Sequence, residues 1–188
     1  MCSSDLSGVD LQLNYRWDVG TFGSMTAAMT GTWLQHNESQ PVPSDQPYDC
    51  AGLFGVTCQT VNPRWHHVAR VTWQTPYNVQ LSAQWRFIGS ASLDNNTGNP
   101  LLQTSAYATK TGQGFDSFDG KLPSVSYLDL SALYEVSKNL SLRLGVNNVL
   151  DKDPPLVNEY NTTTGAPNSY PTYDMLGRQL YAAFTARF

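Results

Sequence analysis

The chain has 188 residues, a formal net charge of −4 and only 14% charged residues, while Phe, Trp and Tyr together make up 12%. The length suffices for one domain, and the negative charge excludes a simple nucleic-acid binder, which needs a basic surface. No run approaches the roughly 18 apolar residues of a membrane helix, but an alternating membrane strand averages to near-neutral hydropathy, so strands have to be sought by pattern.

The first residues do not resemble a secretory signal, because a basic start and an apolar stretch are both missing before Ser7. Residues 1–6, MCSSDL, back-translate from a GTG start codon into the tail of a widely used sequencing adapter. We therefore predict that residues 1–6 are a sequencing-derived leader that is not native, and that the native segment is 7–188.

Two of the three cysteines, Cys50 and Cys58, bracket a short segment outside that leader. Their spacing is too long for a redox pair with two intervening residues, and no second thiol pair or histidine cluster supports a zinc site. We expect a loop disulfide formed in an oxidising compartment, with free thiols as the alternative.

The first half of the chain reads as two pairs of strands. Residues 9–18 alternate apolar and polar side chains without a miss, and residues 24–33 follow the same period of two after a short turn. A connection rich in Pro, Asn and Ser, from about 36 to 62, predicts a long loop. The second pair covers 64–74 and 79–87, with Trp65 and Trp73 separated by about the height of an apolar membrane band at roughly 3.3 Å per residue.

The second half repeats this arrangement. A Gly- and Asn-rich connection from about 89 to 123 precedes strands at 128–136 and 140–146, which a tight turn joins. A third long connection, from about 148 to 173, leads to the last strand, residues 180–188. Its alternate residues are all apolar and end on an aromatic terminus, which indicates that this end is held in an apolar environment.

Short and long connections alternate along the whole chain, as an up-and-down barrel with short periplasmic turns and long external loops requires. The polar strand faces carry Arg16, Arg70, Arg86 and Arg143, which predicts a wet interior. We therefore predict an all-β fold, an antiparallel up-and-down meander of about seven strands. Because single-chain bacterial barrels have even strand numbers, these strands should be an incomplete segment of a transmembrane β-barrel.

Two blocks of sequence resemble the C-terminal part of the TonB-dependent outer-membrane receptors. The first block contains CAGLFG at 50–55, NPRWH at 62–66 and WRFIG at 85–89. The second and more specific block contains YLDL at 127–130, LGVNNVLDKDPP at 144–155, YDMLGR at 173–178 and the terminal Phe188.

The resemblance implies a 22-stranded barrel filled by an N-terminal plug, of which residues 7–188 would be the last seven strands, without the plug domain. It also implies location in the cell outer membrane and import of a scarce substrate, such as a siderophore, cobalamin or a carbohydrate. The implied partners are TonB, ExbB and ExbD acting through the missing N-terminal part, the barrel-assembly machinery and outer-membrane lipid.

Three groups of residues are candidates for roles in such a receptor. The resemblance implies that the terminal stripe is the signal read by the assembly machinery, while rings near the strand ends suit an aromatic girdle. Loop aromatics could stack on a sugar or a siderophore ring, or could pack the loops on each other. The assembly stripe is Leu180, Ala182, Phe184, Ala186 and Phe188; the girdle is Tyr15, Trp17, Trp33, Trp65, Trp73, Trp85, Phe87 and Tyr134; the possible substrate-loop contacts are Tyr107, Phe115, Phe118, Tyr160 and Tyr170.

We expect no catalytic, cofactor or metal site. His66 and His67 point to opposite faces of a strand, and Asp151 and Asp153 lack the spacing of a calcium loop. No nucleophile elbow accompanies the Ser, His and Asp residues. The Asn147–Asn148 pair is expected to shape a strand exit, with a place on the substrate path as the alternative.

Three other functions remain open at this stage. A passive porin or an outer-membrane barrel enzyme would share the alternating strands, although an enzyme would need paired catalytic residues at one rim. A soluble β-sandwich binding module would need the apolar faces of two sheets to meet in a core.

Overall fold

The computed structural model describes residues 3–42, 44–102, 120–157 and 169–187. Almost all regular structure in these residues is β, with two short 3-10 turns, η1 (Gly20–Phe22) and η2 (Asp94–Thr97). Within these ranges, no helix has the length and apolarity needed to cross a membrane. The long strands are β1 (Ser3–Asp18), β2 (Ser24–Gln40), β5 (Trp65–Gln74), β6 (Val79–Ile88), β9 (Val125–Ser137), β10 (Leu140–Asn147) and β11 (Gln179–Ala186).

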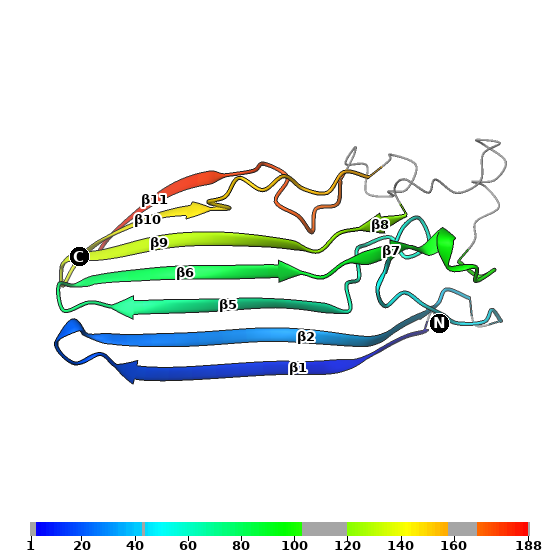
Figure 1. The fold of residues 1–188 in the computed structure, drawn as a ribbon, viewed down its shortest axis with the longest axis horizontal. Coiled ribbons are helices and arrows are strands. Elements are labelled where there is room, and N and C mark those ends of the chain that lie inside the picture. Colours follow the sequence, from blue (N-terminus) through cyan, green and yellow to red (C-terminus); the bar gives the residue numbers. More distant parts are fainter. Residues whose placement is uncertain (1–2, 43, 103–119, 158–168, 188) are drawn as a thin grey trace.

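These seven strands form one antiparallel sheet in the order β1-β2-β5-β6-β9-β10-β11, which is their order along the chain (Figure 1). The predicted meander is therefore confirmed. The first hairpin is longer than predicted, because β1 begins at Ser3 and pairs Ser3–Leu6 with Asn37–Gln40 of β2. That the leader is not native stays a prediction.

The register gives the sheet two chemically different faces. Trp73 lies beside Met25 on one side and Leu81 on the other, and Ala83 lies beside Leu130, so apolar residues of neighbouring strands meet on one face. We name this the apolar face. The opposite face, here the polar face, carries the four predicted arginines Arg16, Arg70, Arg86 and Arg143. A shift of one residue between any two strands would mix the faces, so burial of one face fixes the register.

Local turn chemistry sets the short connections. Asn78 adopts a positive φ of 57° in the turn that the Thr75 N–H closes on the Val79 carbonyl at 2.9 Å. Gly23 has a φ of +96°, and a Cβ there would lie 2.0 Å from the Gln74 carbonyl oxygen. Only glycine can adopt that conformation and accept that approach, so Gly23 is required where the first hairpin meets β5.

The long connections are less irregular than the sequence predicts. Four short strands lie in them: β3 (Tyr48–Asp49) pairs with β2, whereas β4 (Leu53–Phe54), β7 (Ala91–Leu93) and β8 (Lys121–Leu122) form a second sheet. The main hydrophobic core lies beside these short strands. It joins all three long connections to the adjacent ends of the long strands. Its buried members are Phe54, Val61, Ala91, Leu93, Leu122, Val125, Tyr127, Val157, Tyr170 and Tyr173.

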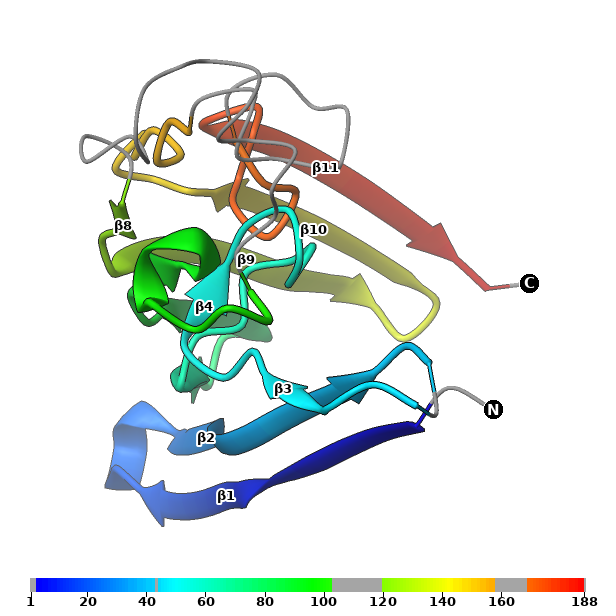
Figure 2. The same cartoon turned by 90° about the vertical axis from the view of Figure 1, so that its right-hand side faces the viewer.

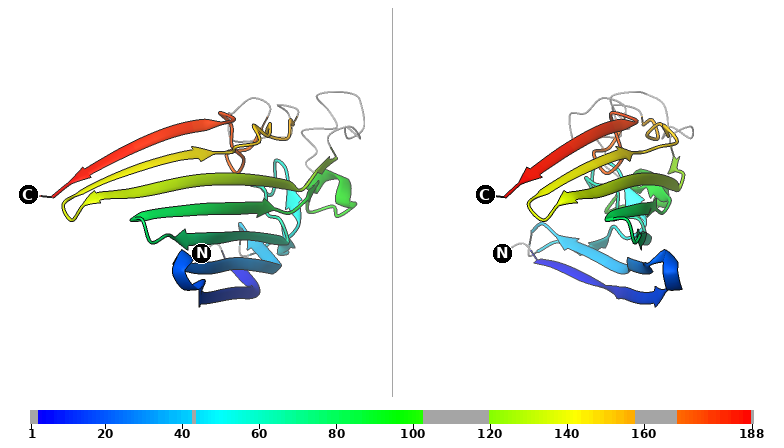
Figure 3. Two further views of the ribbon diagram at one scale, coloured as in Figure 1. Left: turned by 60° about the vertical axis from the view of Figure 1, so that its left-hand side comes forward. Right: turned by 90° about the vertical axis from the view of Figure 1, so that its left-hand side faces the viewer.

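The main sheet is curved, and its two ends differ. Figure 2 looks along the strands and shows the sheet as an arc, with β4 and the segment before β11 in front of its hollow. The short turns gather at the end where the C-terminus lies, and the long connections gather at the other (Figure 1). Figure 3 shows that β1 and β11 form the two edges of the arc, each paired on one side only.

Candidate functional site

Arg86 is the centre of an ionic network on the polar face. Its Nε and one terminal nitrogen donate to the two carboxylate oxygens of Asp129 at 2.7 and 3.0 Å. Its two terminal nitrogens also donate to Asp174, at 2.9 and 2.5 Å. One guanidinium thus holds two carboxylates, both through paired hydrogen bonds, which is the strongest geometry available to an arginine.

The network connects the sheet wall to the third long connection. Arg86 and Asp129 come from the neighbouring strands β6 and β9, whereas Asp174 lies 88 positions from Arg86 in the segment before β11. The Tyr127 ring stacks beneath the guanidinium, 4.9 Å from its centroid, and the Tyr127 hydroxyl accepts a hydrogen bond from the Asp174 N–H at 3.2 Å. The segment is therefore anchored to the wall by side chain and backbone together.

Asn148 caps the exit of β10 and is completely buried. Its backbone N–H donates to Asp129 at 2.8 Å, its side-chain N–H donates to the Lys152 carbonyl, and its side-chain oxygen accepts from the Lys152 N–H. A φ of 51° makes asparagine a suitable residue here. Asn148 thus shapes the strand exit, whereas its neighbour Asn147 lines a pocket.

That pocket, about 460 Å³ in volume, lies between the polar face and the segment that carries Asp174. Arg86, Asp129 and Asp174 form one side of it. Tyr173 lines it as well; burial raises the pKa of Tyr173 to about 12, so its hydroxyl is neutral at pH 7. Charged, amide and apolar side chains thus share one pocket on the polar face.

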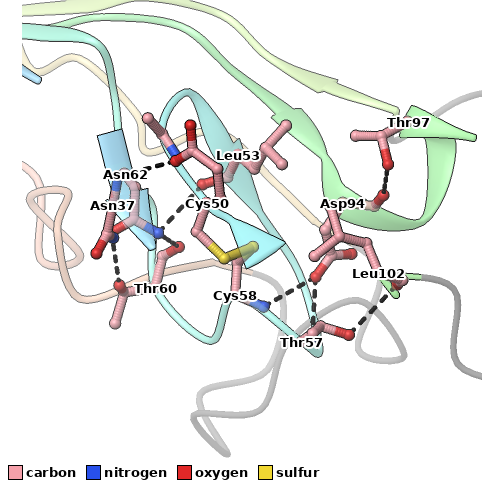
Figure 4. The surroundings of a disulfide bond; sticks show 12 residues. Asn37, Cys50, Leu53, Thr57, Cys58, Thr60, Asn62, Asp94, Thr97 and Leu102 are labelled. Carbon is pink, nitrogen blue, oxygen red and sulfur yellow. Dashed lines mark hydrogen bonds between the residues drawn. A yellow bond between two sulfur atoms is a disulfide. The ribbon is translucent and has the colours of Figure 1, made fainter. Parts of the chain in front are cut away.

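A disulfide closes the first long connection on itself, and a buried aspartate of the second long connection is bonded to the disulfide loop (Figure 4). Cys50 and Cys58 are bonded, and both are buried. The Asp94 carboxylate, completely buried, accepts hydrogen bonds from the backbone N–H groups of Thr57 and Cys58 at 2.8 and 3.0 Å. Burial raises the pKa of Asp94 despite these hydrogen bonds, and Gly55 leaves the space that the carboxylate fills.

Asp49 anchors the loop end of the first hairpin. It accepts hydrogen bonds from the Asn37 N–H at 2.8 Å, the Ala51 N–H at 2.9 Å and the His36 ring at 2.9 Å. Partial burial raises the pKa of Asp49, but the hydrogen bonds together outweigh it, so the pKa is lower than in a free aspartate.

The predicted girdle residues lie on the apolar face towards its two ends. Trp17 stacks on Tyr15 at 5.6 Å near the short turns, where Trp73 donates from its ring N–H to the Phe22 carbonyl and Tyr134 lies opposite Val79. Trp33 lies opposite Trp65 near the long connections. Contact of these rings with lipid headgroups stays a proposal.

His67 lies inside an aromatic cluster at that second end. Its ring stacks on Phe87 at 5.2 Å, meets Trp85 edge-on at 4.5 Å and accepts a hydrogen bond from the Trp65 ring N–H at 2.9 Å. His66 points to the other face. In the described part of the chain, no three acidic, cysteine or histidine side chains gather as a metal site would need.

The remaining predicted residues are those of the assembly stripe and the loop aromatics, and only some of them lie in the described part of the chain. Leu180, Ala182, Phe184 and Ala186 share the apolar face of β11, while Phe188 lies outside the described residues. So do Tyr107, Phe115, Phe118 and Tyr160. Tyr170 is described and fully buried, with its ring edge-on to Phe54 at 5.9 Å, so in this structure it packs the loops together, while its contact with a substrate stays a prediction.

The Arg86 network and the Asp94 anchor were not predicted. Arg86, Asp129 and Asp174 all lie in the sequence blocks that carry the family resemblance, which is the one signal that singles them out. Their pairing joins positions 43 and 88 residues apart, which no local pattern encodes.

The comparison with protein families matches residues 3–149 to the TonB dependent receptor-like β-barrel. Comparison with curated protein sequences gives no significant match.

Similar solved structures come from siderophore receptors. A mutant of the ferric enterobactin receptor PfeA of Pseudomonas aeruginosa, in complex with enterobactin, has a TM-score of 0.63 and 19% identity over 97% of this chain. The siderophore receptor PiuA of Acinetobacter baumannii has a TM-score of 0.52 and 16% identity over 97% of this chain.

These likenesses concern the fold, and this chain spans 22% of each of those two structures. Proteins with this barrel reside in the outer membrane, in agreement with the apolar face of the sheet. The family match covers most of the sequence, and the chain therefore belongs to the TonB-dependent receptor-like β-barrel family.

Proposed function

We propose that this chain is the C-terminal part of the barrel of an outer-membrane receptor that binds a scarce substrate outside the cell and imports it with energy from TonB, ExbB and ExbD. One observation carries the proposal: a meander of seven strands with one apolar and one polar face, within a family match over residues 3–149. TonB would act through a part of the receptor that this chain does not contain.

A siderophore is the substrate class that we favour. The support is the fold similarity to receptors whose structures are described as those of ferric enterobactin and siderophore receptors. The external loops of this chain would contribute a scaffold for such a ligand, because the disulfide, Asp94 and the Arg86 network hold the described parts of the three long connections in place.

The test is uptake by the intact receptor that contains this segment. Cells that lack their own siderophore receptors would express it, and radioactive iron uptake would be measured with enterobactin and other siderophores. We expect uptake that disappears in a strain without TonB. Uptake that proceeds equally well without TonB would support a passive porin instead.

A soluble β-sandwich is the remaining binding alternative. It requires a second layer over the apolar face, yet within the described residues Leu13, Tyr15, Trp33 and Trp85 are each 46% exposed or more. Detergent dependence is the simple check. A monodisperse, detergent-free preparation of the intact protein would contradict the membrane proposal.

A further inference from the structure

The pocket on the polar face is lined by two kinds of residues. The sheet contributes charged and amide side chains, and the segment before β11 contributes Asp174 together with mostly apolar side chains. The sheet residues are Gln84, Arg86, Asp129, Asn147 and Gln179, and the segment residues are Pro171, Tyr173, Asp174, Met175 and Leu176.

The charges of the pocket do not balance. Two carboxylates face one guanidinium, which leaves a formal charge of −1 among the lining residues. Arg70 donates to the Gln84 side-chain oxygen from the next strand but does not line the pocket. An anion would therefore enter against a net negative charge, whereas a cation would complete the balance.

The spare acceptor capacity lies on Asp174. Each Asp129 oxygen already accepts two hydrogen bonds, from Arg86 together with Asn148 or Gln84. Among the described residues, each Asp174 carboxylate oxygen accepts one hydrogen bond, from Arg86 alone, and the Asp174 side chain is 23% exposed. A carboxylate oxygen can accept two, so Asp174 can receive a further donor without releasing Arg86.

Other polar groups that line the pocket also have free hydrogen-bonding capacity within the described residues. The Tyr173 hydroxyl is buried and has no hydrogen-bond partner among the residues that the structure describes. Where the chain is described, the side-chain amides of Asn147 and Gln179 make no hydrogen bond either. Pro171, Met175 and Leu176 offer apolar surface beside these groups, which suits a ligand with a hydrocarbon stem and a polar head.

We propose that this pocket binds an alkylammonium group, with Asp174 as the principal acceptor. The planar fork of Arg86 already fills the paired positions on the carboxylate, and a compact ammonium with three donors suits the remaining lone pairs. The group could be part of a small amine ligand or the side chain of a lysine elsewhere in the receptor. The proposal does not depend on import by the receptor.

The test uses the intact receptor in detergent with methyl-labelled methionine. Met175 lines the pocket, whereas Met25 and Met29 lie on the apolar face and report partition of a probe into the detergent. We expect n-butylammonium to shift the Met175 methyl resonance in a saturable manner, without an equal shift at Met25 and Met29. Sodium butyrate, with a similar stem and the opposite charge, should have no saturable effect.

Substitutions at two positions test the assignment to Asp174. Asp174→Asn should weaken the response by about tenfold or more, the loss expected for one charged hydrogen bond. Leu176→Lys should abolish the response by filling the pocket from its own wall, whereas Leu176→Gln should not. The two Leu176 variants leave the side chains of the Arg86 network intact, so the proposal stays testable if Asp174→Asn fails to fold.

A cross-linking experiment distinguishes the two sources of the amine, a small ligand and a lysine of the receptor. If Met175 does not respond, carbodiimide coupling followed by peptide mapping will show whether Asp174 is joined to a lysine of the receptor, which would support the proposal with the protein as the source. An unresponsive Met175 without such coupling would overturn it. So would an equal response to butyrate, or an unchanged response in Asp174→Asn.

Discussion

Arg86 shows how one side chain determines the position of a distant segment. Its side chain is 26% exposed, and those of Asp129 and Asp174 are 12% and 23% exposed, so the network lies between the surface and the interior. Removing one partner of an ion pair in such a position destabilises the folded protein, because the charge that remains has no opposite charge beside it.

We predict that Arg86→Gln destabilises the intact receptor by about 1 to 3 kcal/mol, less than for a fully buried pair because water still screens the site. The measurement is thermal or denaturant unfolding in detergent, within a double-mutant cycle with Asp174→Asn. Arg143→Gln is the matched control, since Arg143 lies on the same face and has no carboxylate partner in the described ranges. A coupling energy near zero would contradict a direct Arg86–Asp174 interaction.

Asp49 should make the first long connection sensitive to acid. Its folded pKa is lower than the unfolded value of 3.8, so its stabilising contribution is complete above that value and is lost as the pH falls through the folded pKa. We predict that protease cleavage near residues 41–49 rises when the pH drops below about 3.8. An acid-active protease would measure it, and Asp49→Ala, which removes the acceptor of the Asn37 and Ala51 N–H groups, should be cleaved readily at every pH. A wild-type response equal to that of the variant would refute the assignment.

At the scale of elements, the long connections behave as a folded unit. The small sheet β4-β7-β8, the core around Tyr127 and the Cys50–Cys58 disulfide all lie at the loop end of the main sheet. Asp94 at the start of η2 joins this unit by accepting two N–H groups of the disulfide loop.

We predict that Asp94→Ala loosens this unit by about 1 to 3 kcal/mol, because the backbone N–H donors of Thr57, Cys58 and Asn95 lose their acceptor. Asp94→Asn should cost less, since the amide oxygen can still accept. Limited proteolysis of the intact receptor in the membrane would measure the effect, with Asp153→Ala as an exposed control. Equal protease sensitivity of Asp94→Ala and wild type would exclude a supporting role.

At the scale of the whole molecule, the sheet has two edges that need partners. β1 and β11 each pair on one side only, and backbone groups without partners are too costly to leave in hydrocarbon. The rest of a barrel would supply these partners.

We predict that residues 1–188 expressed alone do not form a stable membrane-inserted barrel. Folded barrels migrate differently on gels before and after heating, so the check is heat modifiability beside that of the intact receptor. The intact receptor should show two migration positions and the isolated chain only one. A heat-modifiable, protease-resistant isolated chain would refute this prediction.

Much of the main sheet could be read directly from the sequence. Period-two alternation, as in residues 79–87, predicts both the strand and the face that each residue occupies, because successive side chains of a strand point to opposite sides. Short turns then make the two strands of each hairpin neighbours in space. The pairing of one hairpin with the next, across the long connections, follows from the up-and-down order that a barrel requires.

The tertiary structure decided what local patterns do not contain. Residues 36–62 and 89–123 look irregular because β4, β7 and β8 are only two or three residues long and gain their stability from packing across connections. The contacts of Arg86 with Asp174 and of Asp94 with Cys58 join distant positions, and they form only once the sheet has brought those positions together. The sequence by itself therefore determined the barrel wall, while three-dimensional packing determined the loop unit and the pocket beside Arg86.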